Sequence, residues 1–238
     1  MFFEIREQRI FSLFFYFYKK TSYSNCTLFF IDKRARIFYN VDMKINYEEK
    51  MLSQIATMEK GTKLLLHSCC APCSSACLER LKDHFSITVL YYNPNIGSDE
   101  EYEKRKAEQV RLLKETGWAE ILDCDYDKQA FDEMVKGYEN EPEKGKRCYL
   151  CYKLRMEKTG KTAREKGFDY FATTLTLSPL KNTEWLNEIG EEVAGRYGVN
   201  YLFSDFKKKG GYLRSIQLSK EYGLYRQDFC GCEFSKRK

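Results

Sequence analysis

The chain has 238 residues, of which 43% are hydrophobic and 32% charged, and it contains ten cysteines. This length suits one domain with a sizeable core and excludes two large domains. The formal charge of +5 is low for a strongly basic nucleic-acid-binding protein, and no apolar run approaches the roughly 20 residues of a membrane helix. Because no secretion signal is recognisable, we expect a cytoplasmic protein whose thiols are reduced and serve in metal binding or catalysis.

Residues 1–42 differ in composition from the rest of the chain. They contain nine Phe and four Tyr but no Gly or Pro, and the aromatic residues follow neither a helical nor a strand period. We therefore predict that 1–42 is a disordered or non-native extension from a misassigned start, and that Met43 opens a single α/β domain, 43–238. The alternative is an aromatic N-terminal hairpin.

From residue 43 onward, strand patterns alternate with helix patterns. In chain order we predict a helix at 46–60, a strand at 63–67, a helix at 72–83, a strand at 87–92, a helix at 98–115, a strand at 120–123, helices at 131–136 and 148–167, a strand at 170–174, a helix at 182–197 and a strand at 201–203. Pro72 fits the first turn of its helix, and Ser98 followed by Glu101 has the spacing of a capping box.

This alternation is typical of an α/β, Rossmann-like fold with a mainly parallel sheet flanked by helices. The ligands of such folds bind at the carboxyl ends of the strands. We therefore expect the loops that follow the strands to lie in one neighbourhood.

Cys69, Cys70 and Cys73 lie in the sequence HSCCAPC, at the turn between the first predicted strand of the domain and the helix after it. A helix N-terminus favours thiolate over thiol and attracts anionic groups. Small buried residues in a tight turn would explain one cysteine here but hardly three. The turn is therefore a candidate metal or redox site.

Two further cysteine pairs have metal-binding or redox spacing. Cys148 and Cys151 form a C-x-x-C at the start of a predicted helix, where both sulfurs can face one metal ion. Cys230 and Cys232 form a C-G-C on the C-terminal segment, where the glycine allows two sulfurs to approach. Each pair fits either a redox disulfide or two metal ligands.

The remaining cysteines and the histidines carry weaker signals. Cys77 and Cys124 are expected to be core or incidental residues, and Cys26 falls in the predicted extension. With only His67 and His84 in the chain, a histidine-rich metal site is excluded.

The cysteine pattern by itself leaves the cofactor open. Four thiolates from two pairs can hold either a 4Fe-4S cluster or a tetrahedral zinc ion. An additional close pair favours a reductase, because a structural zinc site needs no extra dithiol. The sequence contains no G-x-G-x-x-G or P-loop motif for a nucleotide.

Several sequence blocks together resemble the QueH family of epoxyqueuosine reductases. They are HSCCAPC, YYNPNI followed by EYEKR, RCYLCYKLR, TTLTLSPLKN and YRQDFCGCEFS, and they extend from about Leu64 to Ser235. The resemblance implies a nucleotide-hydrolase or PP-loop-like α/β fold. It also implies an oxidoreductase that reduces epoxyqueuosine to queuosine at the wobble position of the tRNAs for Asp, Asn, His and Tyr, with electrons from an unidentified donor.

The same resemblance implies roles for individual cysteines. The four implied ligands of a 4Fe-4S cluster are Cys69, Cys70, Cys148 and Cys151. Cys230 and Cys232 would form a redox-active disulfide, and Cys73 is a candidate ligand of an additional mononuclear iron.

Residues that bind the RNA are less clearly marked. Candidates for holding the nucleoside by stacking and phosphate contact are Tyr149, Tyr152, Arg155 and Lys181. Basic patches occur at 144–147, 207–209 and 236–238, and each is also compatible with ordinary solvated surface.

Two functions of other classes remain alternatives. One is a zinc-stabilised RNA-binding module without catalysis, in which the basic patches contact the RNA. The other is a thiol-disulfide oxidoreductase that uses Cys230 and Cys232 alone.

Overall fold

The computed structural model describes residues 26–32, 37–43 and 45–235, which divide into two units, Met1–Asn46 and Tyr47–Lys238. In the first unit, β1 (Cys26–Asp32) pairs antiparallel with β2 (Ile37–Met43). The two strands lie in the segment for which the sequence analysis gives an N-terminal hairpin as the alternative to a disordered extension. The rest of the predicted extension, 1–25 and 33–36, lies outside the described residues, and the start at Met43 stays a prediction.

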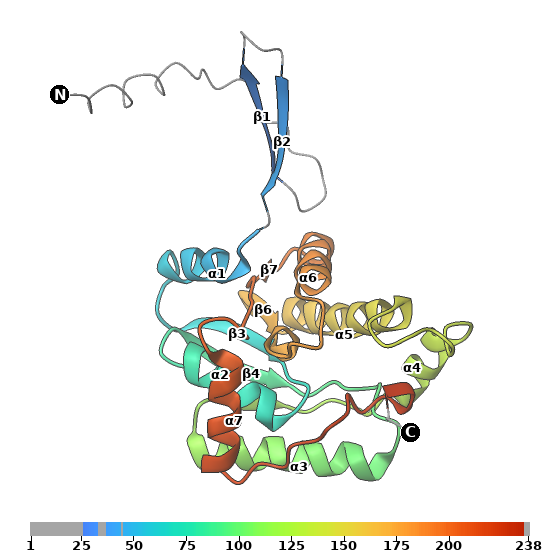
Figure 1. The fold of residues 1–238 in the computed structure, drawn as a ribbon. Helices are drawn as coiled ribbons and strands as arrows, with labels where there is room; N and C mark the ends of the chain where they lie inside the picture. The colour runs from blue at the N-terminus through green and yellow to red at the C-terminus, as the bar shows by residue number, and fades with distance from the viewer. Residues whose placement is uncertain (1–25, 33–36, 44, 236–238) are drawn as a thin grey trace, which may run out of the picture. The chain divides into compact units, whose positions relative to one another are not determined.

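The second unit contains a parallel sheet with the strand order β5-β4-β3-β6-β7 (Figure 1). Its strands are β3 (Thr62–His67), β4 (Phe85–Leu90), β5 (Glu120–Leu122), β6 (Tyr170–Thr173) and β7 (Asn200–Tyr201). The chain builds outward from β3 in one direction and then resumes on its other side at β6. The strand order therefore reverses between β3 and β6, which is where ligands bind in Rossmann-like sheets.

The helices form a layer on each side of this sheet (Figure 1). On one side α2 packs against α3 and α7, and on the other α5 packs on β3, β6 and α6. The helices are α1 (Tyr47–Ala56), α2 (Ala71–Leu81), α3 (Asp99–Thr116), α4 (Lys128–Val135), α5 (Lys146–Glu165), α6 (Thr183–Tyr197) and α7 (Gly211–Glu221), with short 3-10 helices η1 (Thr174–Leu177) and η2 (Glu233–Ser235). Within the described ranges, every helix is too short or too polar to cross a lipid bilayer.

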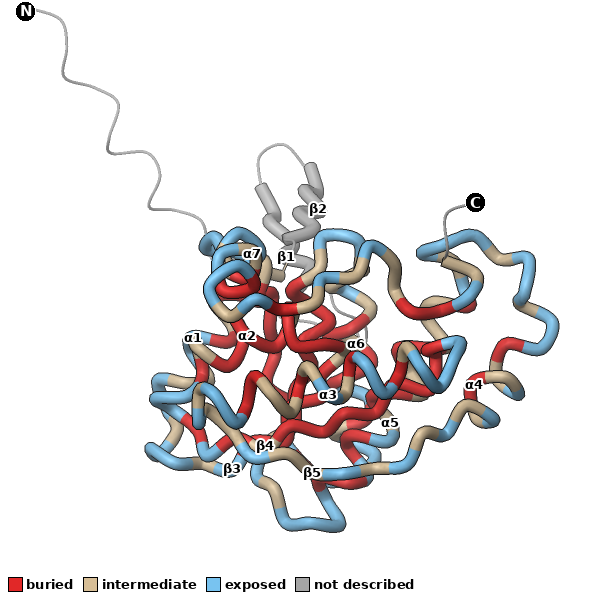
Figure 2. Tube along the Cα trace, turned by 90° about the horizontal axis from the view of Figure 1, so that it is seen from below, coloured by how far each residue is buried: buried red, intermediate tan, exposed pale blue. Residues whose placement is uncertain are grey.

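The core follows from the apolar run in β3. Leu64, Leu65 and Leu66 are fully buried, because a strand in the centre of a parallel sheet is covered on both faces. Leu64 and Leu66 point to the same face and pack in one cluster with Leu78 and Leu81 of α2. Figure 2 shows that the buried residues run through the middle of this unit, with exposed residues on the outer helices and loops.

The structure confirms the α/β, Rossmann-like fold, and each predicted strand of the domain is present. It also contains α7, which the sequence analysis did not predict. The residues that α7 buries are Ser215, Leu218 and Ser219, whereas Tyr212 and Leu213 are exposed, so the apolar residues of this segment do not mark its buried face. Helix α5 begins at Lys146, two residues before the predicted start at Cys148.

Candidate redox site

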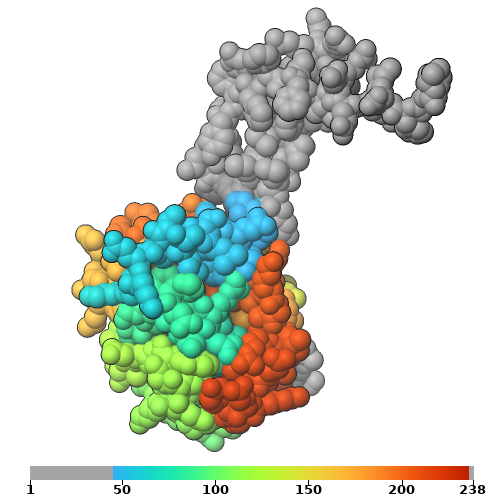
Figure 3. Space-filling view, turned by 90° about the vertical axis from the view of Figure 1, so that its left-hand side faces the viewer, coloured from blue at the N-terminus to red at the C-terminus, as the bar shows by residue number. Residues whose placement is uncertain are grey.

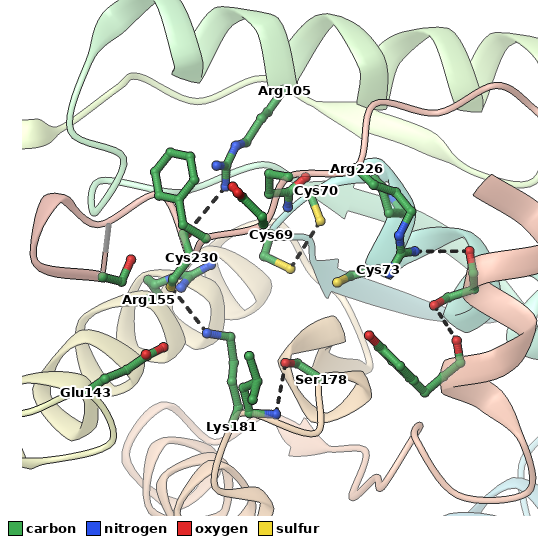
Figure 4. A pocket seen from close by; sticks show the side chains of 18 residues that line it. Cys69, Cys70, Cys73, Arg105, Glu143, Arg155, Ser178, Lys181, Arg226 and Cys230 are labelled. Atoms are coloured by element: carbon green, nitrogen blue, oxygen red, sulfur yellow. Dashed lines mark hydrogen bonds between the residues drawn. The ribbon is translucent and has the colours of Figure 1, made fainter. Parts of the chain in front are cut away.

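The turn from β3 into α2 brings three sulfur atoms together. Cys70 adopts an extended backbone conformation immediately before α2, and Pro72 occupies the first turn of the helix, where its missing N–H is not needed. The Sγ atoms of Cys69, Cys70 and Cys73 all lie within 4.8 Å of one another, and those of Cys69 and Cys70 are 3.8 Å apart. Figure 4 shows them pointing into the same space. Cys73 is thus a full member of this group.

Hydrogen bonding within the group concentrates negative charge on one sulfur. Contacts from the Cys70 and Cys73 thiols hold the pKa of Cys69 well below its usual value, and Arg155 and the Thr174 hydroxyl, 3.6 Å from the sulfur, lower that pKa further. The Cys69 thiolate raises the pKa of Cys70 to about 12 and that of Cys73 as well. The three thiols of the group are therefore unequal, and negative charge is favoured most at Cys69.

The C-x-x-C pair of α5 lies beside the C-terminal cysteines. Cys148, Cys151, Cys230 and Cys232 line one small cavity. Cys148 accepts a hydrogen bond from the backbone N–H of Lys144 at 3.3 Å, whereas Cys151 is buried in an apolar cluster with Cys232. Burial raises the pKa of Cys151. Every cysteine from Cys69 to Cys232 is a free thiol in this structure.

The segment that carries Cys230 and Cys232 is held by the loop after β4 and by α3. The carbonyl of Cys230 accepts hydrogen bonds from Arg105 at 3.3 Å and from the Asn95 side chain at 3.4 Å, and Gly97 donates to the carbonyl of Gly231 at 3.0 Å. Gly231 has a φ of +96°, and a Cβ there would lie 3.0 Å from both Arg105 and Ile96. Glycine is therefore needed between the two cysteines.

Two cations lie among these sulfur atoms. Arg155 of α5 is 1% exposed and donates to Asn93 Oδ1 at 2.6 Å, and its Nη1 lies 4.0 Å from the sulfur of Cys151. Lys181 donates to Cys230 Sγ at 3.3 Å. Among the residues that the structure describes, no carboxylate pairs with either cation. Their pKa values would fall on burial, but nearby sulfur groups, including Cys69 and Cys230, raise both.

Lys181 in turn affects the thiol that it contacts. Burial alone would raise the pKa of Cys230, but the charges of Lys181 and Arg155 outweigh this effect and lower the pKa below its usual value. Cys232 has no such contact, and burial raises its pKa to about 12. The two cysteines of the C-G-C pair are therefore electrostatically unequal, and the nucleophilic thiolate form is favoured more at Cys230 than at Cys232.

A larger cavity of about 240 Å³ opens in front of these groups. Cys69, Cys70, Cys73 and Cys230 line it, together with Arg155 and Lys181 (Figure 4). Lys181 and Cys230 also line the small cavity around Cys148 and Cys151, so the two cavities adjoin. Thus thiols from three segments far apart in the sequence line two adjoining cavities near the point where the strand order reverses.

The donor set fits a thiolate-bound metal cofactor. A tetrahedral ion with metal–sulfur bonds of about 2.3 Å separates its sulfur ligands by about 3.8 Å, close to the distance between Cys69 and Cys70. Metal centres with several thiolate ligands are anionic, and the buried Arg155 and the half-buried Lys181 complement that charge. In the described part of the chain, only Cys69, Cys70 and Cys73 form a cluster of three or more close cysteine, histidine or carboxylate ligands.

The candidates for nucleoside binding separate in the structure. Lys181 lines both cavities. Arg155 lines the larger cavity and Tyr152 the smaller one, and both are buried residues rather than surface residues. Tyr149 packs edge-on against Trp185, with ring centroids 5.4 Å apart, and lines neither cavity. Arg147, which the sequence placed in a basic patch, is also buried, and it donates to the carbonyls of Tyr138, Glu139 and Glu141. It therefore supports the loop before Cys148 and is not available to RNA.

The other cysteines and the histidine of β3 are located as expected. Cys77 is fully buried in the main core, and Cys124 donates to the carbonyl of Tyr91 at 3.1 Å. Neither lines the cavities. His67 is buried beside Arg155 and Thr173, and burial with the nearby Arg155 charge lowers its pKa to about 3. It is therefore a neutral supporting residue and not a metal ligand.

The sequence analysis did not assign roles to Asn93, Asn95 or Arg105, which position Arg155 and the Cys230 segment. All three lie inside the blocks YYNPNI and EYEKR. Polar residues in a loop directly after a parallel strand are a usable signal, since such loops border the ligand site.

Comparison with known proteins places the chain in a family. Residues 64–238 match the model of the family described as "Epoxyqueuosine reductase QueH". Proteins of that name from Streptococcus pyogenes and Staphylococcus epidermidis are each 41% identical to this chain, over 83% of it and over 81% and 87% of their own lengths. The protein of that name from Thermotoga maritima is 36% identical over 72% of this chain and 89% of its own length. The chain is therefore an oxidoreductase that belongs to the QueH family of epoxyqueuosine reductases.

Proposed function

We propose that this protein reduces epoxyqueuosine to queuosine at the wobble position of tRNA, in the cytoplasm. The observation that carries the proposal is a pair of adjoining cavities lined by thiols of three chain segments and by Arg155 and Lys181, two cations with which no carboxylate of the described residues pairs. A hydrolase or a simple binding module has no need of so many thiols around one cavity. The names of the related proteins supply the substrate.

The metal centre of this proposal is a 4Fe-4S cluster. Its ligands would be Cys69, Cys70, Cys148 and Cys151. The close grouping of Cys73 with Cys69 and Cys70 supports a further role for Cys73, as a ligand of an additional mononuclear iron. When bound, such a centre supplies single electrons and a Lewis acid for the epoxide oxygen.

The C-G-C pair would act as the dithiol of the reaction. Removing an epoxide oxygen as water, with formation of an alkene, takes two electrons and two protons. Oxidation of Cys230 and Cys232 to a disulfide releases two electrons and two protons, so the reaction balances. Lys181 stabilises the Cys230 thiolate, and a separate electron donor must then reduce the disulfide for the next turnover.

The experiment that tests this proposal is anaerobic purification followed by analysis of iron, sulfide and zinc, with an assay on tRNA that contains epoxyqueuosine. We expect absorbance at about 400 nm, where thiolate-bound iron-sulfur clusters absorb and zinc does not. We also expect conversion of epoxyqueuosine to queuosine. Zinc without iron, and no conversion, would instead favour the zinc-stabilised RNA-binding module. Disulfide exchange in a protein without iron would favour the thiol-disulfide oxidoreductase.

Cys73→Ser is expected to lower the ratio of iron to sulfide while the sulfide content stays unchanged. The reason is that Cys73 is the third member of the close thiol group but is not among the proposed cluster ligands. The measurement is iron and sulfide content per chain. Cys77→Ser is the matched control, one helical turn further along α2 in the core, and should keep its iron. Equal loss of iron and sulfide in Cys73→Ser would make Cys73 a cluster ligand.

Lys181→Met is expected to raise the pKa of Cys230. The ammonium group lies 3.3 Å from the sulfur and favours the thiolate. Lys181 depresses the pKa of Cys230 in the folded protein. The contribution of this contact to folding stability is therefore fully present above the usual thiol pKa of about 8.5, and it is lost as the pH falls through the pKa of the folded protein. The measurement is the pH dependence of Cys230 alkylation, followed by mass spectrometry of its peptide. Lys153→Met, which removes an exposed ion pair with Glu192, is the control.

An unchanged alkylation profile in Lys181→Met would show that Arg155 alone sets the Cys230 pKa. The same variant should lose stability relative to the wild type mainly at alkaline pH, where the Cys230 thiolate is fully formed.

A further inference from the structure

Exposed apolar side chains gather at the mouth of the larger cavity. In the described part of the chain, the large hydrophobic residues that are exposed are Leu52, Leu180, Tyr212 and Leu213. Leu180 and Tyr212, 50% and 38% exposed, line the cavity, and Leu213, 59% exposed, follows Tyr212 on α7. Figure 3 shows α7, in orange-red, at the surface of the molecule. Three of these four residues therefore lie at one place, beside the candidate redox site.

Cations accompany these apolar residues. Lys208 and Lys209 are exposed in the turn that leads into α7, and Arg226 lines the cavity (Figure 4). Arg226 donates to the Ser215 carbonyl at 3.3 Å and the Ser219 hydroxyl at 3.0 Å, so it is held against α7. Where the structure describes side chains, no carboxylate forms an ion pair with any of these three cations.

Their neighbour Lys207 behaves differently, since it pairs with Asp205 at 2.6 Å. The carboxylates that line the cavity are Glu143 and Asp228, against four cations, Arg105, Arg155, Lys181 and Arg226. Inside the cavity, Arg105 pairs with Glu101 at 2.6 Å, and Arg155 and Lys181 lie against sulfur atoms, so the cations left for a ligand are those at the mouth.

We propose that this surface binds a single-stranded loop of the RNA substrate, and we call it the α7 rim: Leu180, Lys208, Lys209, Tyr212, Leu213 and Arg226. The inference rests on the proposed function and names the part of the protein that holds the RNA. Tyr212 and its apolar neighbours stack on the bases beside the modified nucleoside. Lys208, Lys209 and Arg226 contact phosphates.

The chemistry of an RNA loop matches the rim better than that of a duplex does. A base that enters the cavity must leave its stack, and the flanking bases then expose faces that aromatic side chains can cover. A duplex presents phosphates and no free base faces, so it would use the cations and leave the apolar residues exposed. The combination of exposed apolar residues and unpaired cations is typical of surfaces that bind single strands.

The test measures binding of a fluorescent anticodon stem-loop RNA, without modification, to the full anaerobic protein by anisotropy. We expect Tyr212→Ala to weaken binding on the order of tenfold, because stacking of one base contributes roughly that much. Tyr212→Phe retains the ring and should bind like the wild type. A duplex with the same stem and no loop should bind equally to all three proteins.

Lys208→Gln combined with Arg226→Gln tests the phosphate contacts. The slope of log affinity against log salt should fall by about 0.7 to 0.9 for each contact that is lost. The matched control is Lys166→Gln combined with Arg164→Gln. Both residues are exposed at the C-terminal end of α5, just before β6, so they lie at the amino ends of the strands and away from the cavity. Leu52→Ala is the control for Tyr212→Ala. Iron content and thermal melting show that each variant is folded and loaded.

The outcomes separate this inference from the proposed function. If the α7 rim variants bind the stem-loop as tightly as the wild type, the assignment of the α7 rim as the RNA-binding surface is wrong, whether or not the wild type reduces epoxyqueuosine. If the wild type binds through the rim but reduces nothing, the proposed function fails and the rim stands. If the variants keep their RNA affinity but lose turnover with a protein reductant and not with dithionite, the surface binds an electron-carrier protein, which overturns the RNA assignment.

Discussion

Replacing Cys230 and Cys232 together by Ser is expected to abolish or strongly slow turnover and to leave the iron and sulfide content nearly unchanged. Cys230 lines the larger cavity with Cys69, Cys70 and Cys73 but is not a member of their close group, and its sulfur contacts Lys181. Cys230 is a stabilised thiolate beside Lys181, and Cys232 is a buried thiol two residues away. This asymmetry suits a dithiol that carries electrons, since one sulfur attacks and the other resolves. The measurements are metal content and single-turnover kinetics with a chemical reductant.

The matched variant for this experiment is Cys148→Ser. It should lose the cluster and also stability, because metal binding and folding are coupled. Loss of iron from the Cys230/Cys232 variant would contradict the assignment and place those two residues among the ligands. Full turnover of that variant would remove the dithiol from the reaction.

Arg155→Leu is expected to lower the free energy of unfolding by about 3 kcal/mol or more. Arg155 is 1% exposed, donates to Asn93 and contacts His67, and its charge stabilises the Cys69 thiolate. Its removal leaves the buried carboxamide oxygen of Asn93 without its partner and takes away one of the groups that stabilise negative charge on Cys69. The measurement is urea denaturation of the anaerobic protein, together with its iron content.

The control for Arg155→Leu is Arg196→Leu. Arg196 is 47% exposed and pairs with Glu157 and Glu192 on the surface, where ion pairs contribute about 1 kcal/mol or less. Equal losses in the two variants would show that the charge of Arg155 has no special partner. Retention of stability with loss of iron would show that Arg155 serves the cofactor and not the fold.

Local patterns in the sequence were sufficient to determine every strand of the parallel sheet and all helices of the domain longer than one turn except α7. Leu64–Leu66 form a continuous apolar run, which in an α/β protein indicates a central buried strand, and Ser98 caps α3 as its spacing predicts. The position of Cys69, Cys70 and Cys73 at a helix N-terminus followed from the same patterns, because each depends on residues only a few positions apart. Helix α7 was missed because its buried face is formed mainly by serine.

The assembly of the site was decided only by the tertiary structure. The order β5-β4-β3-β6-β7 places the turn after β3 beside η1, which follows β6, and no local pattern encodes which strands become neighbours. In the sequence, Arg155 cannot be distinguished from a surface residue of an amphipathic helix. In the folded protein it is buried and donates to Asn93 in the loop after β4. Lys181 and Cys230 are 49 residues apart, and their contact exists because Arg105 and Asn95 hold the C-terminal segment over the cavity. The sequence by itself therefore identified which thiols are present and on which elements, whereas long-range packing decided which of them share a space and which cations stabilise them.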